Sequence, residues 1–177
     1  EDSSEFSSGL VYDEKGGWSQ NTEGVPSAVS VWGYLLDEDK NPLPKAADEL
    51  KHSSFLSLVG PSMMSTGAPK LQIYYVGPKD ASIMRATPYS EQAQTFDLLY
   101  PGHNEGANFW DFFFPGVYEG WQGWIKDPSS KPVESNIVTT APYIDAITGK
   151  LIVSFFHPLW TQDRKDVAGM VAVDITL

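Results

Sequence analysis

The last third of the chain carries three apolar segments with strand-forming composition, and they constrain the fold more than any other feature. These segments span residues 136–144, 151–160 and 167–177, and each is rich in β-branched or aromatic residues. The turn residues 145–149 join the first segment to the second. Because strands joined by short turns pair in antiparallel fashion, this block predicts an antiparallel sheet.

A second hairpin is expected upstream of this block. Residues 71–76 and 82–87 have strand composition, and the turn residues 77–80 lie between them. The helical signal precedes these strands. We therefore expect an α+β fold with an antiparallel sheet of about five strands and an N-terminal helix packed on one face.

The expected helix spans residues 45–58, where apolar residues recur at helical spacing directly after Pro44. Gly60-Pro61 is expected to interrupt or kink it. Residues 1–30 have weak periodicity, and we expect them to be mostly loop with a short element near residues 10–12.

Residues 88–132 form a long connection rich in Gly, Pro, Asn and aromatic residues. A connection of this length inside a small domain is typically a functional loop, so we expect it to cover a pocket. Its aromatic residues 109–114 favour a core or loop-anchoring role over a cavity wall, and Trp110 is the best candidate among them for ligand contact.

Composition excludes several classes of function. The 177 residues suit one domain, and the net charge of −11 without a basic run argues against nucleic acid and anionic lipid as partners. The chain has no cysteine and no apolar run long enough to span a membrane. It opens without Met or a signal peptide, so we expect a domain excised from a larger protein.

The polar residues of the last third follow a fixed order. Pro142-Tyr143-x-Asp145 is followed by Thr148-Gly149, by a strand containing Pro158, and by Gly169 and Asp174 in the last strand. This pattern resembles the end of the membrane-distal module of double Cache domains, the extracytoplasmic PAS-like sensor modules of bacterial receptors. The resemblance extends more weakly back to Lys45. It implies a PAS-like sensing domain at residues 45–177, with residues 1–44 as an N-terminal extension of unassigned role.

The resemblance also implies a ligand site. In amino-acid-sensing Cache domains the residues matching Tyr143, Asp145 and Asp174 line the pocket and grip the ammonium group of the ligand. Those members also carry an Arg-x-Trp-Tyr segment whose arginine binds the ligand carboxylate, and this chain has no such segment. An amine or amino-acid-like ligand is therefore expected, with an amine favoured.

Three further residues are candidates for this site. Trp110 and Tyr118 lie in the long central connection, and Arg85 on the second strand of the upstream hairpin is a cation that would reach the ligand from another direction. Each of the three motif residues also has an ordinary structural explanation. Asp145 suits the turn, and Asp174 suits a solvated strand end. Tyr143 is expected to be buried with its hydroxyl satisfied.

The functional expectation is a ligand-binding sensor domain that lies outside the cytoplasm and belongs to a membrane-anchored receptor of the histidine kinase, cyclase or chemoreceptor type. No catalytic or metal motif is present, so we expect a non-enzyme without cofactor. Residues 1–44 lack heptads, so the isolated piece is expected to be monomeric, with homodimerisation left to the full receptor. The alternative is a carbohydrate-binding or adhesion module using surface residues such as Trp121 and Trp124.

Overall fold

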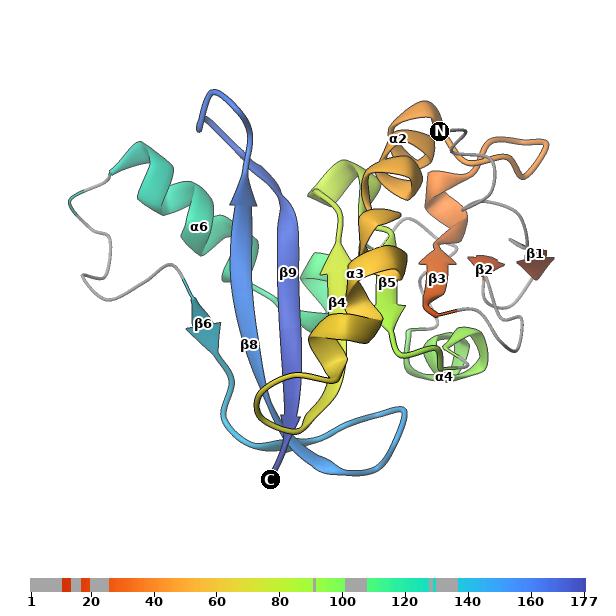
Figure 1. Cartoon of the computed structure of the whole chain (residues 1–177). Helices are drawn as coiled ribbons and strands as arrows, with labels where there is room; N and C mark the ends of the chain where they lie inside the picture. The colour runs from red at the N-terminus through yellow and green to blue at the C-terminus, as the bar shows by residue number, and fades with distance from the viewer. Residues whose placement is uncertain are drawn as a thin grey trace.

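An antiparallel sheet flanked by helices on both faces organises the chain (Figure 1). The computed structural model describes residues 11–13, 17–19, 26–90, 92–100, 108–127, 129 and 137–177. The strands are β1 (Val11–Asp13), β2 (Gly17–Ser19), β3 (Ala28–Val31), β4 (Lys70–Val76), β5 (Met84–Thr87), β6 (Val138–Thr139), β7 (Tyr143–Ile144), β8 (Leu151–Trp160) and β9 (Val167–Thr176). The helices are α2 (Pro44–His52), α3 (Phe55–Met64), α4 (Ala93–Leu99), α5 (Phe109–Phe113) and α6 (Val117–Lys126), with short 3-10 helices η1 (Gly33–Leu35) and η2 (Lys79–Ala81).

The expected α+β class and both expected hairpins are confirmed. The strand order is β1-β2-β3-β5-β4-β9-β8-β6, with β7 also on β8, so the described residues contribute nine strands rather than about five. β4 pairs with β5 on one side and with β9 on the other, and β9 pairs with β8 over nearly its full length. The segment expected as one strand over residues 136–144 forms two short strands, β6 and β7, on the outer edge of β8.

The first part of the chain contributes more to the sheet than expected. Residues 1–30 were expected to be mostly loop with a short element near residues 10–12, where β1 lies. Strands β2 and β3 add to the sheet, and β3 pairs with β5. All four residues of β3 are buried. The sheet therefore includes residues from the predicted N-terminal extension as well as from residues 45–177, and the domain boundary itself stays a prediction.

The helix pair α2 and α3 covers one face of the sheet (Figure 1). Leu56 of α3 packs there with Ile73 and Tyr75 of β4. The helix breaks at Ser53-Ser54, not at Gly60-Pro61 as expected, and α3 continues through Pro61 to Met64. Burial of Leu56 and Gly60 holds α3 against the sheet, and this packing outweighs the hydrogen bond that a proline removes.

The long connection on the other face is largely helical rather than a loop. Its described residues form α4, α5 and α6, and the main core lies between them and the sheet. Trp32, Trp110 and Trp121 are fully buried in that core. None of the described helices has the length and apolar character needed to cross a membrane.

Candidate ligand-binding site

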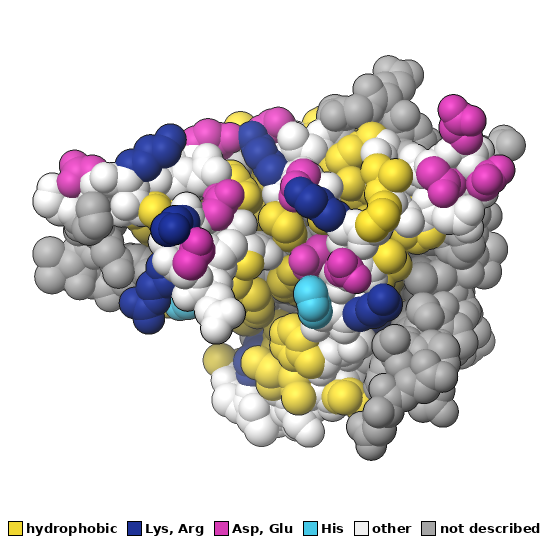
Figure 2. Space-filling view, turned by 90° about the horizontal axis from the view of Figure 1, so that it is seen from above, with side chains coloured by type: hydrophobic (Ala, Val, Ile, Leu, Met, Phe, Trp, Pro, Cys, Tyr) yellow, Lys and Arg dark blue, Asp and Glu magenta, His cyan; other side chains and the backbone are white. Residues whose placement is uncertain are grey.

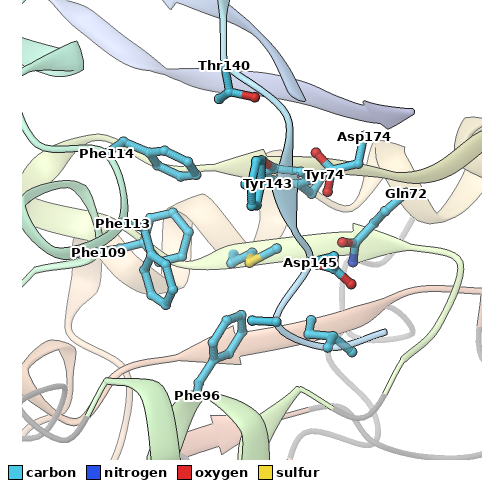
Figure 3. A pocket seen from close by; sticks show the side chains of 13 residues that line it. Gln72, Tyr74, Phe96, Phe109, Phe113, Phe114, Thr140, Tyr143, Asp145 and Asp174 are labelled. Carbon is cyan, nitrogen blue, oxygen red and sulfur yellow. The ribbon is translucent and has the colours of Figure 1, made fainter. Parts of the chain in front are cut away.

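A cavity of about 240 Å³ lies between the sheet, the aromatic residues of α4 and α5, and the segment around β7 (Figure 3). Pockets for drug-sized ligands run from about 300 to 1,000 Å³, so this one suits a small metabolite. Among the described residues, its lining is Gln72, Tyr74, Met84, Phe96, Phe109, Phe113, Phe114, Thr140, Tyr143, Asp145, Ala146, Ile147 and Asp174.

The floor of the cavity is set by the register of three central strands. Asp174 of β9 lies opposite Gln72 of β4 on one side and Ser154 of β8 on the other. Because side chains alternate along a strand, Asp174 faces the cavity while Val173 and Ile175 face the other side of the sheet. Asp174 is 3% exposed, so its carboxylate is a buried charge inside the cavity.

Asp145 reaches the same cavity from a turn. Its Oδ2 accepts hydrogen bonds from the backbone N–H of Thr148 at 2.7 Å and from the Thr148 hydroxyl at 2.5 Å. The turn role and the cavity position expected for this residue therefore coexist. Asp145 Oδ1 bonds to no other residue in the described part of the chain, so it is available to a ligand.

A chain of hydroxyl groups supports Asp174. Ser154 Oγ donates to Asp174 Oδ1 at 2.5 Å, and the Tyr143 hydroxyl lies 2.7 Å from Ser154 Oγ. Since the single proton of Ser154 is used on Asp174, Tyr143 is the donor to Ser154. Tyr143 has its hydroxyl satisfied as expected, but the residue is 37% exposed rather than buried, so it lies at the cavity rim.

Burial dominates the electrostatics of Asp174. Burial and, to a smaller extent, the nearby negative charge of Asp145 raise the pKa of the carboxyl group, while hydrogen bonds from Ser154 and Tyr74 oppose the change, and the pKa is about 6. A bound cation would compensate this charge. No Lys, Arg or His is among the cavity-lining residues of the described ranges.

The opposite end of the cavity is apolar and aromatic. Phe96, Phe109, Phe113 and Phe114 form a connected group whose ring centroids lie 4.8 to 5.6 Å apart in successive pairs. Figure 3 shows these rings on one side and Gln72, Asp145 and Asp174 on the other. The phenylalanine cluster thus serves both as core and as cavity wall, whereas the sequence favoured a core role.

Arg85 does not lie in this cavity. Residues alternate along β5, so Met84 faces the cavity and Arg85 faces the helix pair. Its guanidinium donates to Ser53 Oγ at 3.0 Å, to Ser57 Oγ at 3.1 Å and to the Leu50 carbonyl at 3.1 Å. Burial lowers the pKa of Arg85 to about 10. The structure therefore assigns this predicted ligand residue to the α2–α3 junction.

Trp110 and Tyr118 are also absent from the cavity lining. Both are buried, Trp110 Nε1 donates to the Gly77 carbonyl at 2.8 Å, and the Tyr118 hydroxyl donates to the Val167 carbonyl at 3.1 Å. These hydrogen bonds connect α5 to the end of β4 and α6 to the start of β9. Of the six residues predicted for the site, the structure brings together Tyr143, Asp145 and Asp174.

The tryptophans proposed for the carbohydrate alternative are not an exposed platform. Trp121 is fully buried and stacks edge-to-face with Trp110, and Trp124 is half-buried against the core. Trp121 therefore offers no ring face on which a sugar would stack.

Several polar residues that line the cavity or support Asp174 were not predicted from the sequence. Gln72, Ser154 and Thr140 are polar residues in strands or strand-flanking positions, and Gln72 and Ser154 are buried. A polar residue at a buried strand position was the available signal, because such groups need a partner. Phe113 was expected in the core rather than in the cavity wall, since a run of phenylalanines is more often core.

A second hollow lies at the opposite end of the strands, among α2, η2, α6 and the β8–β9 turn. Both lysines that line it are already paired: Lys79 Nζ lies 2.6 Å from Asp111 Oδ1 and also pairs with Glu119, and Lys45 pairs with Asp80. Figure 2, which views the molecule from this end, shows acidic and basic side chains interspersed. Within the described ranges, no cluster of His, Asp and Glu side chains is arranged to hold a metal ion.

Together the fold and the cavity define an α+β domain with an acidic, aromatic-lined pocket. No protein-family model matches the sequence, and no curated protein does. Solved structures to which the chain is similar include the ligand-binding domain of the Pseudomonas fluorescens chemoreceptor CtaA in complex with L-serine. It has a TM-score of 0.41 and 16% identity, over 74% of this chain and 44% of that one.

Two other chemoreceptor domains are similar. The sensory domain of Campylobacter jejuni Tlp3 with isoleucine has a TM-score of 0.35 and 12% identity, over 80% of this chain and 42% of that one. The ligand-binding domain of Pseudomonas aeruginosa PctC with GABA has a TM-score of 0.35 and 13% identity, over 75% of this chain and 53% of that one. The chain thus spans about half the length of these domains.

Proposed function

We propose that this chain is the ligand-sensing part of an extracytoplasmic sensor domain in a bacterial transmembrane receptor, and that it binds a small organic cation without catalysing a reaction. The observation that carries this proposal is the cavity with two buried carboxylates, Asp145 and Asp174, facing an aromatic wall. The receptor's output module, whether kinase, cyclase or chemotaxis type, would lie elsewhere in the parent protein.

A cation fits this cavity better than an anion or a zwitterion. A hydrogen bond from an ammonium group to a carboxylate contributes about 1.5–3 kcal/mol. Two such bonds together with apolar burial approach the roughly −8 kcal/mol of micromolar binding. The carboxylate of an amino acid would meet no cationic partner among the described lining residues. An amine is therefore favoured over an amino acid.

Binding would act through a population shift. The cavity is walled by the sheet on one side and by α4 and α5 on the other, so a ligand that contacts both favours arrangements in which they stay closed. The parent receptor would read that shift through the elements that continue toward the membrane.

Calorimetric titration of the purified domain tests the proposal. Primary amines are compared with amino acids, carboxylates and sugars, using wild type, Asp174→Asn, and Asp48→Asn as a matched control on the exposed face of α2. Amine binding that is lost in Asp174→Asn and kept in Asp48→Asn supports the proposal. Binding of sugars or carboxylates alone, or amine binding that survives Asp174→Asn, would overturn it.

A further inference from the structure

The cavity is divided chemically along its length. Its polar end holds Gln72, Asp145 and Asp174, and its phenylalanine end holds Phe96, Phe109, Phe113 and Phe114 (Figure 3). Both carboxylates lie at the polar end, where the charge of Asp145 acts on Asp174. A ligand that fills the cavity must therefore be charged at one end and apolar at the other.

The polar end matches one ammonium group. An ammonium ion has three N–H donors and no acceptor. Asp145, Asp174 and Gln72 each present an oxygen acceptor toward this end (Figure 3). The side chain of Gln72 is buried and bonds to no other described residue, so its amide oxygen is available as the third acceptor.

The phenylalanine end does not match a second charge. Its rings already pack against one another and against Phe156 of β8, and no acidic residue lines that end in the described ranges. Cation–π attraction to such rings is weaker than the loss of hydration when an ammonium group is buried. A diamine of the same length would therefore place its second ammonium in an environment that disfavours it.

We propose that the cavity selects primary monoamines with an apolar body, holding the ammonium among Asp145, Asp174 and Gln72 and the body among the four phenylalanines. This inference rests on the proposed function, since it specifies the class of cation. It predicts discrimination against diamines, against very short amines, and against amines carrying a carboxylate.

A series of simple amines tests the inference on the wild-type domain. Ethylamine, pentylamine and 1,5-diaminopentane are titrated by calorimetry, with 1-pentanol as the neutral analogue of pentylamine. Each buried methylene group strengthens binding about fourfold, so pentylamine is expected to bind up to about 60-fold more tightly than ethylamine. The diamine is expected to bind at least about tenfold more weakly than pentylamine, and the alcohol more weakly still.

The two proposals fail in different ways. Equal binding of ethylamine, pentylamine and the diamine would overturn the selectivity while leaving a cation site intact, and so would a preference for the diamine. Binding of 1-pentanol as tight as that of pentylamine would overturn both, because it would show that the carboxylates contribute nothing.

A pair of phenylalanine variants locates the apolar body. Phe113→Asn places an amide at the phenylalanine end, so it is expected to weaken pentylamine binding much more than ethylamine binding and to remove most of the advantage of pentylamine. Phe112→Asn is the matched control, since Phe112 is 46% exposed and does not line the cavity. An unchanged ratio in a folded Phe113→Asn protein would contradict the inference, and the wild-type series decides it if that variant does not fold.

Discussion

The buried charge of Asp174 favours the binding of a cation but lowers the stability of the ligand-free domain. Without a ligand its charge is buried and only partly compensated by Ser154 and Tyr74, and its pKa rises to about 6. An unfolded chain would ionise this group near about 3.9. The folded state therefore holds the proton more tightly, and the ligand-free domain loses stability as the pH rises from about 4 through 6.

Asp174→Asn is expected to stabilise the ligand-free domain at neutral pH while removing amine binding. A difference of about two pKa units corresponds to about 3 kcal/mol, so the free energy of unfolding at pH 8 should increase by up to that amount. Near pH 4 the wild-type group is protonated as well, and the two proteins should differ little. Urea denaturation at both pH values measures this, and an equal difference at pH 4 and pH 8 would contradict the assignment.

The affinity for an amine is expected to fall in acid. Below about pH 6 a proton and the ligand compete for Asp174, so the dissociation constant should rise about tenfold for each further pH unit. The amine itself stays charged throughout this range. Calorimetry between pH 8 and pH 5 should show a plateau above about pH 7 and a decline below about 6. An affinity that does not change over this range would rule out Asp174 as the titrating contact.

At the scale of elements, the position of α3 depends on a close approach to β5. A Cβ at Gly60 would lie 2.7 Å from Thr87 Oγ1 and 2.9 Å from Thr87 Cβ, whereas a Cβ at Gly120 in α6 would meet nothing within 4 Å. Gly60→Ala is therefore expected to destabilise the domain by about 1–3 kcal/mol. Gly120→Ala should stabilise it by about 0.5–1 kcal/mol, as a helix normally does when glycine is replaced.

Chemical denaturation of the two variants measures this contrast. Stabilisation of similar size in both would mean that α3 does not press on β5 at this point.

Arg85 joins the helix pair to the sheet and should affect stability rather than binding. Arg85→Met removes the three hydrogen bonds to Ser53, Ser57 and the Leu50 carbonyl, so the free energy of unfolding is expected to fall by about 1–3 kcal/mol. Amine affinity should stay within about twofold of wild type. A variant that kept its stability but lost binding would show that Arg85 reaches the ligand after all.

The elements themselves could be predicted only where one physical signal dominated. The long strands β8 and β9 were evident from composition and turn residues. The helices of residues 109–126 were not, because glycine and consecutive aromatic residues are poor helix formers. One signal was present: Asn108 caps α5 by accepting a 3.0 Å hydrogen bond from the N–H of Asp111.

For the whole molecule, one face of the sheet serves stability and the other carries the cavity. One face carries α2 and α3, held by Leu56 and by Arg85, and the other carries the cavity and the aromatic core. A ligand between the sheet and α5 can thus shift the helices on the cavity face, while α2 and α3 stay packed on the other face. This separation fits a sensor in which one layer moves relative to another.

A site residue could be predicted only where the sequence indicated which face of the sheet its side chain points to. Asp174 follows buried alternating residues on a long strand, so its direction was accessible from the sequence. All four residues of β5 are buried, so both of its faces are covered and its pattern did not tell which one Arg85 points to. Tyr143, Asp145 and Asp174 came from an ordered motif, whereas Gln72 and Ser154 became apparent only from the pairing of β4, β9 and β8.

A crystal structure of the domain with a bound primary amine would show directly whether Asp145 and Asp174 hold an ammonium group. We expect an ammonium nitrogen within about 3.2 Å of carboxylate oxygens of both Asp145 and Asp174, with the carbon chain directed toward Phe113. An amine bound instead at the paired charges around Lys79, or an aspartate pair that makes no contact with the amine, would contradict it.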